Sequence, residues 1–157
     1  MLTDNHLKFL SRNETETIEV AKEFAASLRV GDVVALSGEL GAGKSVFCRA
    51  VMRALGVVDE ALPSPTFSII QEYDAANSVA GEYRRVTHMD WYRLGDADEI
   101  EMLGIRDYFQ PPWICLIEWA ERANGLLSDA TIRVHISCVA NDMESRLVEI
   151  TGETPQD

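Results

Sequence analysis

One segment of the sequence has the residue types and the spacing of a phosphate-binding loop. Residues 38–45 match the pattern G-x-x-x-x-G-K-[S/T] at every fixed position. Glycines allow the backbone to curl, so that successive N–H groups face phosphate oxygens, and a helix that starts directly after the loop presents its positive end to the same anion. We therefore expect this loop to bind ATP together with Mg²⁺. Its residues are Gly38, Glu39, Leu40, Gly41, Ala42, Gly43, Lys44 and Ser45.

Two polar side chains of the loop and two carboxylates elsewhere are candidates for the chemistry. Lys44 is predicted to neutralise the β- and γ-phosphates, and the Ser45 hydroxyl is predicted to be a ligand of Mg²⁺. Glu118 and Asp90 each end an apolar, strand-like run. Because the carboxyl ends of parallel strands meet beside such a loop, we expect one carboxylate near the metal and the other near the attacking water. A solvated carboxylate at a strand end is the alternative for each.

Thr66 is a candidate switch residue. It lies in a segment that contains Pro63 and Pro65, which disfavour helix in the residues before them. A hydroxyl in such a loop could approach Mg²⁺ or the γ-phosphate and change position on hydrolysis. An ordinary turn residue is the alternative. We interpret His88 as a packed strand residue rather than a catalytic base. Arg93 and Arg106 could stabilise the charge of a transferred phosphate, and a surface or structural partner is the alternative for each.

The hydrophobic pattern predicts the elements that position these residues. Apolar side chains recur at helical spacing before and after the loop, and a short apolar run directly before it is typical of a strand covered on both faces. Ser11 with Glu14, or Asn13 with Glu16, could cap the first helix. The pattern predicts a single α/β domain of the phosphate-loop type, with a mixed, mostly parallel central sheet flanked by helices. The expected helices are 15–29, 45–55, 96–103 and one that ends near Gly125, and the expected strands are 33–36, 67–73, 83–90, 113–117, 131–139 and 146–150.

Length and charge exclude several classes of protein. The chain has 157 residues, 46% of them hydrophobic, which suits one globular domain over residues 1–157. Its net charge of −12 opposes extensive direct binding to RNA or DNA, because such binding depends on Lys and Arg that displace counterions. No run approaches the roughly 18–20 apolar residues that span a bilayer, and residues 1–6 lack the order of a signal peptide. Cys48, Cys115 and Cys138 are interpreted as buried free thiols in a reducing compartment, so the cytoplasm is the expected location.

With these residues identified, the chain resembles the TsaE family, also called YjeE, which are small bacterial ATPases of the tRNA threonylcarbamoyladenosine pathway. The resemblance extends over about residues 17–146, and the order of its motifs is specific. Ser45 stands where the family usually has Thr, and Met89 and Trp91 replace Phe and Leu around Asp90; these exchanges should keep the hydroxyl and the carboxylate in place. The motifs that carry the resemblance read GELGAGKS, SPTF, HMDWYRL, EIEM, GIRDYF and LIEW.

The resemblance implies roles for particular residues. Ser45 and Glu118 are implied to contact Mg²⁺, Asp90 to be needed for hydrolysis, and residues 64–67 to form a nucleotide-responsive loop. Further residues are implied to lie near the nucleotide: Trp119 beside the site, and Glu14 or Thr17 at the adenine.

The resemblance also implies partners. Proteins of this family hydrolyse ATP slowly alone and act with TsaB and TsaD, which transfer the threonylcarbamoyl group to an adenosine beside the tRNA anticodon. Hydrolysis by a protein of this kind would reset the complex between turnovers. The acidic composition agrees with a chain that meets tRNA only indirectly, through those partners.

Three other functions remain open at this point. A small-molecule kinase would need an acceptor pocket and an arginine-rich lid, whereas the run after Asp90 offers only Arg93 and Arg106. A GTP-dependent switch would need a guanine-reading Asn-Lys-x-Asp motif, which the chain lacks. A nucleotide-gated binding module, in which hydrolysis is incidental, overlaps with the family role.

Overall fold

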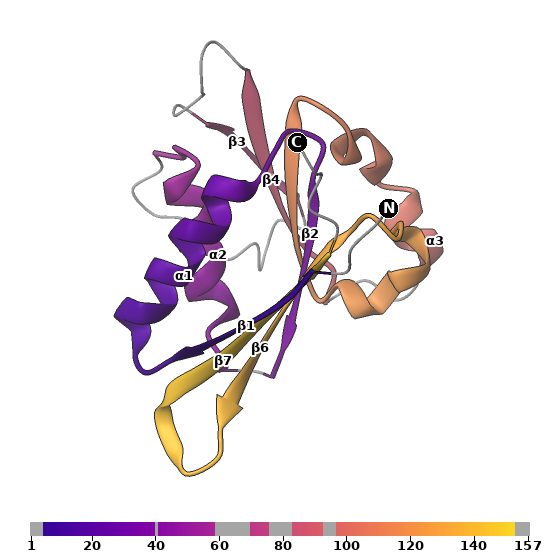
Figure 1. Ribbon diagram of the computed structural model, residues 1–157. Helices are drawn as coiled ribbons and strands as arrows, with labels where there is room; N and C mark the ends of the chain where they lie inside the picture. The colour runs from indigo at the N-terminus through magenta and orange to yellow at the C-terminus, as the bar shows by residue number, and fades with distance from the viewer. Residues whose placement is uncertain (1–4, 40, 59–69, 76–82, 93–96, 153–157) are drawn as a thin grey trace.

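The structure is a computed structural model, and it describes residues 5–39, 41–58, 70–75, 83–92 and 97–152 (Figure 1). Leu40, Thr66 and the whole of residues 64–67 lie outside these ranges. The strands are β1 (Asn5–Ser11), β2 (Val33–Gly38), β3 (Ile70–Ala75), β4 (Arg84–Asp90), β5 (Trp113–Glu118), β6 (Ile132–Val139) and β7 (Asp142–Gly152). The α-helices are α1 (Glu14–Ser27), α2 (Lys44–Ala54) and α3 (Ala97–Glu101), and the 3₁₀ helices are η1 (Ile105–Phe109) and η2 (Ala120–Leu126).

The strands form a single seven-stranded sheet with a parallel centre. Its order is β1-β7-β6-β2-β5-β4-β3. Strands β6, β2, β5 and β4 are parallel to one another, whereas the pairs β1–β7, β7–β6 and β4–β3 are antiparallel. The prediction of an α/β fold with a mixed sheet is therefore confirmed, with the parallel strands in the middle and the antiparallel pairs toward the edges.

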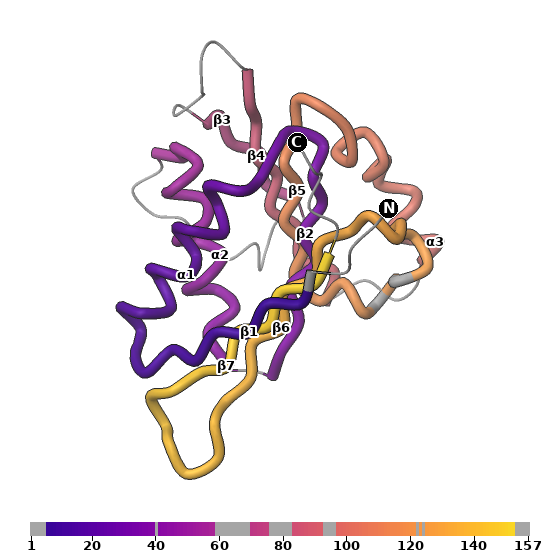
Figure 2. The backbone as a smooth tube through the Cα atoms, viewed as in Figure 1, coloured from indigo at the N-terminus to yellow at the C-terminus, as the bar shows by residue number. Residues whose placement is uncertain are grey.

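Helices cover both faces of this sheet. Helices α1 and α2 lie side by side against one face, and α3 lies on the other (Figures 1 and 2). Alternate residues of the central strands therefore enter two separate cores: Ile114 and Leu116 of β5 pack with α1 and α2, while Cys115 and Ile117 pack with α3, η1 and η2. Burial on both faces explains why β5 is a continuous apolar run rather than an alternating one.

Each expected helix and strand corresponds to an element of the structure, whereas strand β1 and the 3₁₀ helix η1 were not expected. The N-terminal strand β1 was missed; it pairs with β7 along its whole length. The prediction that all three cysteines are buried is wrong for Cys138, which is exposed. Strand β2 ends at Gly38 opposite Ile136, so the part of β6 beyond Ile136 has no strand on that side, and a register shift follows Cys138. The residues between β3 and β4, 76–82, lie outside the described ranges.

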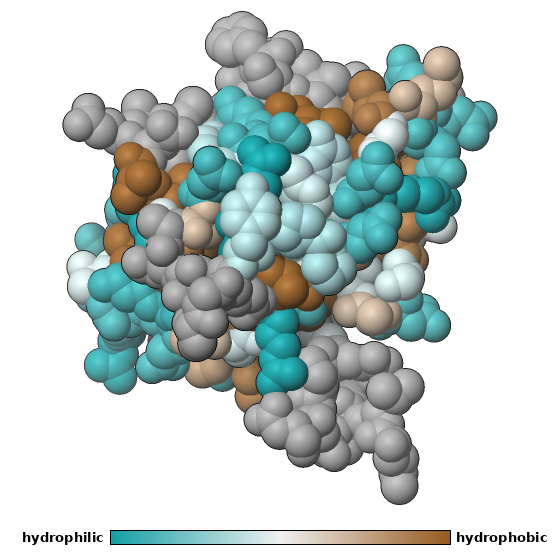
Figure 3. Space-filling model, turned by 90° about the horizontal axis from the view of Figure 1, so that it is seen from above, coloured by the Kyte–Doolittle hydropathy of each residue, from teal (hydrophilic) through white to brown (hydrophobic). Residues whose placement is uncertain are grey.

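The amino ends of the parallel strands are closed by aromatic contacts. The Tyr108 ring meets Trp113 edge-on at 4.8 Å between centroids, and the Arg85 guanidinium lies 4.5 Å from the Trp113 ring. Figure 3 looks onto this end, where hydrophilic and intermediate side chains dominate and the strongly hydrophobic areas are small and separate. Across the ranges that the structure describes, no helix has the length and apolar character needed to traverse a membrane.

Candidate nucleotide site

The parallel register brings the predicted site residues to one edge of the sheet. Asp90 and Glu118 are direct register partners at the ends of β4 and β5, and Glu118 is also opposite Leu36 of β2. Two residues after Leu36, β2 ends at Gly38 and the loop begins. The loop and both carboxylates therefore meet at the carboxyl edge, where ligands bind in open α/β sheets.

The backbone of the loop requires glycine at its start. A Cβ on Gly38 would lie 2.2 Å from the carbonyl oxygen of Ile136 on β6, so any larger residue would push the two strands apart. Gly41 and Gly43 have φ angles of +81° and +98°, in the left-handed region that glycine adopts at little cost. Helix α2 begins directly after Gly43 with no side-chain cap and no acidic residue in its first turn. Its first N–H groups and its positive dipole end are therefore available to an anion.

Lys44 is buried, with 6% of its surface exposed, and its ammonium group has two neighbours. Its Nζ donates a hydrogen bond of 2.8 Å to the Gly38 carbonyl and lies 3.8 Å from the centroid of the Trp119 ring. The Trp119 ring in turn contacts Tyr92 at 4.8 Å between centroids. The predicted proximity of Trp119 to the loop is thus a direct contact with its lysine. This cation–π arrangement holds the ammonium group at the mouth of the loop.

Glu118 forms a buried charged pair that the sequence pattern did not reveal. The His88 Nε2 and the Glu118 carboxylate are 2.7 Å apart, with 1% and 3% of the two residues exposed. Burial alone would lower the pKa of His88, but the Cys48 sulfur and the Glu118 carboxylate beside it outweigh burial and raise the pKa to about 10. The expectation that His88 is a packed strand residue agrees with its burial, and its imidazolium also orients Glu118.

Asp90 lies at the same edge but is partly open to solvent. Burial raises the pKa of its carboxyl above the ordinary value, and the nearby Glu118 carboxylate acts in the same direction, while the Tyr92 N–H, His88 and Lys44 oppose the shift. One carboxylate oxygen accepts the Tyr92 N–H at 2.8 Å. This bond fixes the turn after β4 and leaves the second oxygen of Asp90 for other partners.

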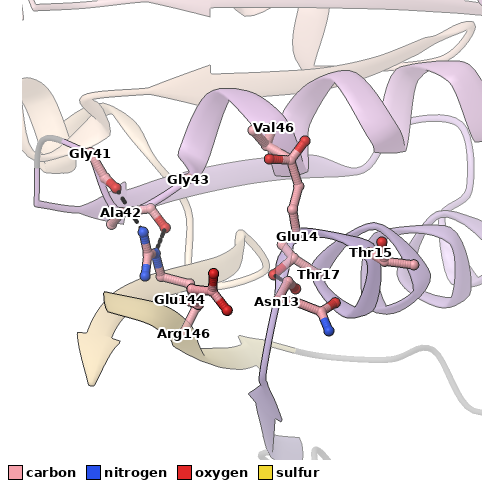
Figure 4. A pocket seen from close by; sticks show the side chains of 10 residues that line it. All are labelled: Asn13, Glu14, Thr15, Thr17, Gly41, Ala42, Gly43, Val46, Glu144 and Arg146. Atoms are coloured by element: carbon pink, nitrogen blue, oxygen red, sulfur yellow. Dashed lines mark hydrogen bonds between the residues drawn. The ribbon is translucent and has the colours of Figure 1, made fainter. Parts of the chain in front are cut away.

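On the other side of the loop, the structure forms a cavity of about 520 Å³. It lies between the start of α1, the loop and the end of the β6–β7 hairpin (Figure 4). Glu14 is exposed at its rim, whereas Thr17 is buried and its hydroxyl is already hydrogen-bonded to Ser11 and to the Asn13 carbonyl. The lining residues are Asn13, Glu14, Thr15, Thr17, Gly41, Ala42, Gly43, Val46, Glu144 and Arg146.

The donor set at the carboxyl edge fits a magnesium ion better than a transition metal. Ser45 offers a hydroxyl at the first turn of α2, and Glu118 offers a carboxylate. Within the described ranges, no cluster of three or more His, Cys, Asp or Glu side chains could enclose a metal. Mg²⁺ keeps several waters and is commonly held by one or two protein oxygens together with substrate phosphates, so this sparse oxygen set suits it.

Sequence reasoning missed Arg146, which contacts the loop from β7. Its Nε donates a hydrogen bond of 3.0 Å to the carbonyl of Ala42, a residue 104 positions earlier in the chain. No motif marks this residue, because only the strand order β7-β6-β2 brings the end of the hairpin beside the loop. Arg106, by contrast, pairs with Glu101 at 2.9 Å, as expected of a residue with a structural partner. Arg93 lies outside the described residues.

Comparison with known proteins gives consistent matches. A family model described as threonylcarbamoyl adenosine biosynthesis protein TsaE matches residues 11–148. A protein from Haemophilus influenzae named tRNA threonylcarbamoyladenosine biosynthesis protein TsaE is 38% identical over 122 residues, which are 78% of this chain and 71% of that protein. A Bacillus subtilis protein with the same name is 38% identical over 136 residues, 87% of this chain and 80% of the relative. The crystal structure of YdiB from Bacillus subtilis superposes with a TM-score of 0.75 at 32% identity, covering 97% of this chain and 88% of that one.

Proposed function

Because this chain belongs to the TsaE family and acts in tRNA threonylcarbamoyladenosine biosynthesis, we propose that its part in that pathway is to bind ATP with Mg²⁺ and hydrolyse it. The observation that carries the proposal is the loop of residues 38–45, which opens onto an uncapped helix N-terminus beside two carboxylates. An anion at this place meets backbone N–H groups and the Lys44 ammonium, while Asp90 and Glu118 stand at the neighbouring strand ends.

The residues of the loop bind the triphosphate. Lys44 exchanges its bond with the Gly38 carbonyl and its contact with Trp119 for the β- and γ-phosphates. The N–H groups at the start of α2 donate hydrogen bonds to oxygens of the same phosphates. The Ser45 hydroxyl and the Glu118 carboxylate would hold Mg²⁺, and His88 keeps the Glu118 carboxylate in place. The bound ion would supply positive charge to the triphosphate.

Asp90 positions the water that attacks the γ-phosphate. It is the register partner of Glu118, and one of its oxygens is fixed by the Tyr92 N–H. The other oxygen can accept a hydrogen bond from a water and so aim its lone pair at phosphorus. Thr66 remains a prediction for the nucleotide-responsive loop, since it lies outside the described residues.

The adenosine occupies the cavity between α1, the loop and the hairpin. Its volume of about 520 Å³ lies within the usual range for small-molecule sites, roughly 300–1,000 Å³. Glu14 can contact the nucleoside from the rim. The Thr17 hydroxyl is engaged with Ser11 and Asn13, so Thr17 shapes the wall of the cavity rather than donating to the base.

Partners complete the proposed reaction cycle. The chain acts with TsaB and TsaD in the cytoplasm, releases phosphate slowly alone, and resets their complex between turnovers. Two of the described arginines agree with slow turnover: Arg146 is bonded to backbone carbonyls, and Arg106 is paired with Glu101. Neither is free to stabilise the charge of a transferred phosphoryl group, which in related chemistry accelerates hydrolysis greatly.

Calorimetry and phosphate release test the proposal together. Wild-type protein should bind ATP only with Mg²⁺, and Lys44→Ala should weaken binding by about 10- to 100-fold, the value of a lost charge-assisted contact. Lys22→Ala, at an exposed lysine of α1, is the matched control and should bind normally. Asp90→Asn should bind ATP but lose phosphate release, and wild-type release should rise when TsaB and TsaD are added. Nucleotide binding unchanged in Lys44→Ala, or a phosphorylated metabolite in place of free phosphate, would overturn the proposal.

A further inference from the structure

We propose that Arg146 is a positioning residue that gives the phosphate loop its binding shape before any nucleotide arrives. This inference deepens the proposed function and rests on it. The observation behind it is that one guanidinium group joins the loop to the β6–β7 hairpin, through bonds to backbone oxygens on both sides. Figure 4 shows the bonds on the side of the loop, to Gly41 and Ala42.

The hydrogen bonds of the Arg146 side chain all go to backbone carbonyl groups. Nε donates to the Ala42 oxygen at 3.0 Å and Nη2 to the Gly41 oxygen at 3.3 Å. Nη1 donates to the oxygens of Met143 and Ser145, each at 2.8 Å. Among the residues that the structure describes, no carboxylate lies within ion-pair distance of this guanidinium. The guanidinium therefore has no direct carboxylate partner there, although the nearby Asp142 carboxylate interacts with its charge.

These bonds determine where a loop N–H group points. In a trans peptide group, the C=O and N–H bonds point in opposite directions. Arg146 draws the Ala42 carbonyl toward β7, so the N–H of Gly43, which shares that peptide group, is turned away from β7 and toward the space that the loop encloses. The Ala42 N–H is already used in a turn with the Glu39 carbonyl at 3.1 Å. The Gly41 carbonyl belongs to the same peptide group as the Ala42 N–H, so the hydrogen bond from Arg146 to this carbonyl also holds the turn in place.

Packing cannot replace this support. Among the described residues, an added Cβ at Gly41 or Gly43 would meet nothing within 4 Å, so no side-chain packing at that position confines either backbone, and both have left-handed φ angles. Glycine samples many other conformations at similar energy. An unsupported loop would therefore spend much of its time in shapes that point N–H groups elsewhere, and ATP binding would have to supply the cost of ordering it.

The hairpin end is itself a rigid anchor. The Asp142 carboxylate accepts the N–H groups of Glu144 and Ser145 at 3.1 and 3.2 Å and the Ser145 hydroxyl at 2.6 Å. Strand β7 is further paired with both β6 and β1. Lysine could not substitute at position 146, because a single ammonium group cannot reach carbonyls on both sides in the way that a planar guanidinium does.

The test compares Arg146→Lys and Arg146→Met with wild type and with Arg53→Met, a control at an exposed arginine of α2. The probes are Mg²⁺ with ATP, with ADP and with inorganic pyrophosphate, the last measured by competition with a fluorescent ADP analogue. Both Arg146 variants should bind all three ligands about 10- to 100-fold more weakly, as expected for lost hydrogen bonds of a charged group. The thermal unfolding midpoint should fall in both Arg146 variants, because hydrogen bonds to backbone carbonyls are lost, so binding is measured well below that midpoint. Arg53→Met should bind as wild type.

Pyrophosphate separates this role from a direct contact with the nucleoside. If Arg146 shapes the loop, affinity for pyrophosphate falls by the same factor as affinity for ADP. A loss confined to ADP and ATP would mean that Arg146 touches base or sugar, and the proposal would be overturned. Full rescue by lysine would equally overturn it in favour of charge alone. As a measurement without ligand, amide hydrogen exchange at Ala42, whose N–H donates to the Glu39 carbonyl at 3.1 Å, should be faster in both variants than in wild type, and equal rates count against the proposal. Wild-type protein that binds none of the probes would reject the proposed function itself.

Discussion

Trp119 adopts a backbone conformation that is costly for its side chain. Its φ angle is +61°, in the left-handed region that disfavours residues with a Cβ by about 1–2 kcal/mol. The residue directly follows Glu118, and its ring supports the Lys44 ammonium at 3.8 Å. The turn that points Glu118 at the sheet edge and the turn that places the ring over Lys44 are therefore the same turn. Strain at such a position is typical of a site whose geometry is selected for function.

Two substitutions distinguish the effect of the Trp119 backbone conformation from the effect of its ring. Trp119→Gly and Trp119→Ala both remove the contact with Lys44, but only alanine keeps the left-handed penalty. We expect the glycine variant to be more stable than the alanine variant by about 1 kcal/mol in urea unfolding. An alanine variant as stable as the glycine variant would show that the backbone at this position is not strained. Both variants should bind ATP with altered affinity, because Lys44 loses its resting contact.

At the level of elements, sequence patterns predicted those parts of the fold that depend on local chemistry. The spacing of apolar residues identified α1 and α2, because a helix packed on a sheet must repeat its apolar face every turn. The loop was found because its residues are consecutive in the chain, and the two carboxylates were found because each ends an apolar, strand-like run. Strand β1 was missed because the alternation of polar and apolar residues covers only His6 to Phe9, and its order comes from pairing with β7.

Contacts between distant elements could not be predicted in this way. The bond from Arg146 to Ala42 and the pair of His88 with Glu118 join residues 104 and 30 positions apart. Nothing local to Arg146 distinguishes it from another arginine on a strand. The strand order alone decides what it meets. His88 was assigned to a packed strand, yet the register of β4 against β5 was needed to show that it faces Glu118.

Asn13, which lines the cavity, is also the residue that caps α1. Asn13 Oδ1 accepts the Glu16 N–H at 2.9 Å, which selects the second of the two predicted caps, and Glu16 reaches back to the Arg12 N–H at 3.5 Å. Asn13→Ala should lower the free energy of unfolding by about 1 kcal/mol, and Asn13→Asp, which keeps an acceptor, should not. Chemical denaturation measures both. Equal losses in the two variants would mean that the cap does not stabilise α1.

For the whole molecule, the net charge of −12 predicts how the chain meets tRNA. The isolated protein should show no binding to labelled tRNA in fluorescence anisotropy at about 50 mM salt, because a surface with this excess of carboxylates cannot displace enough counterions. In the presence of TsaB and TsaD, tRNA should associate with the complex. Tight binding by the isolated chain that weakens steeply between about 50 and 200 mM salt would contradict this prediction.

The three thiols of the chain differ sharply in accessibility. Cys48 and Cys115 are enclosed by the two cores, whereas Cys138 is exposed where β6 runs past the end of β2. A maleimide dye should consequently attach to the folded wild-type protein at one place, without removal of any other cysteine. That place is the residue opposite Arg146 in the hairpin register. The emission wavelength and the fluorescence anisotropy of such a label would then report changes in the surroundings of the hairpin in real time as ligands bind.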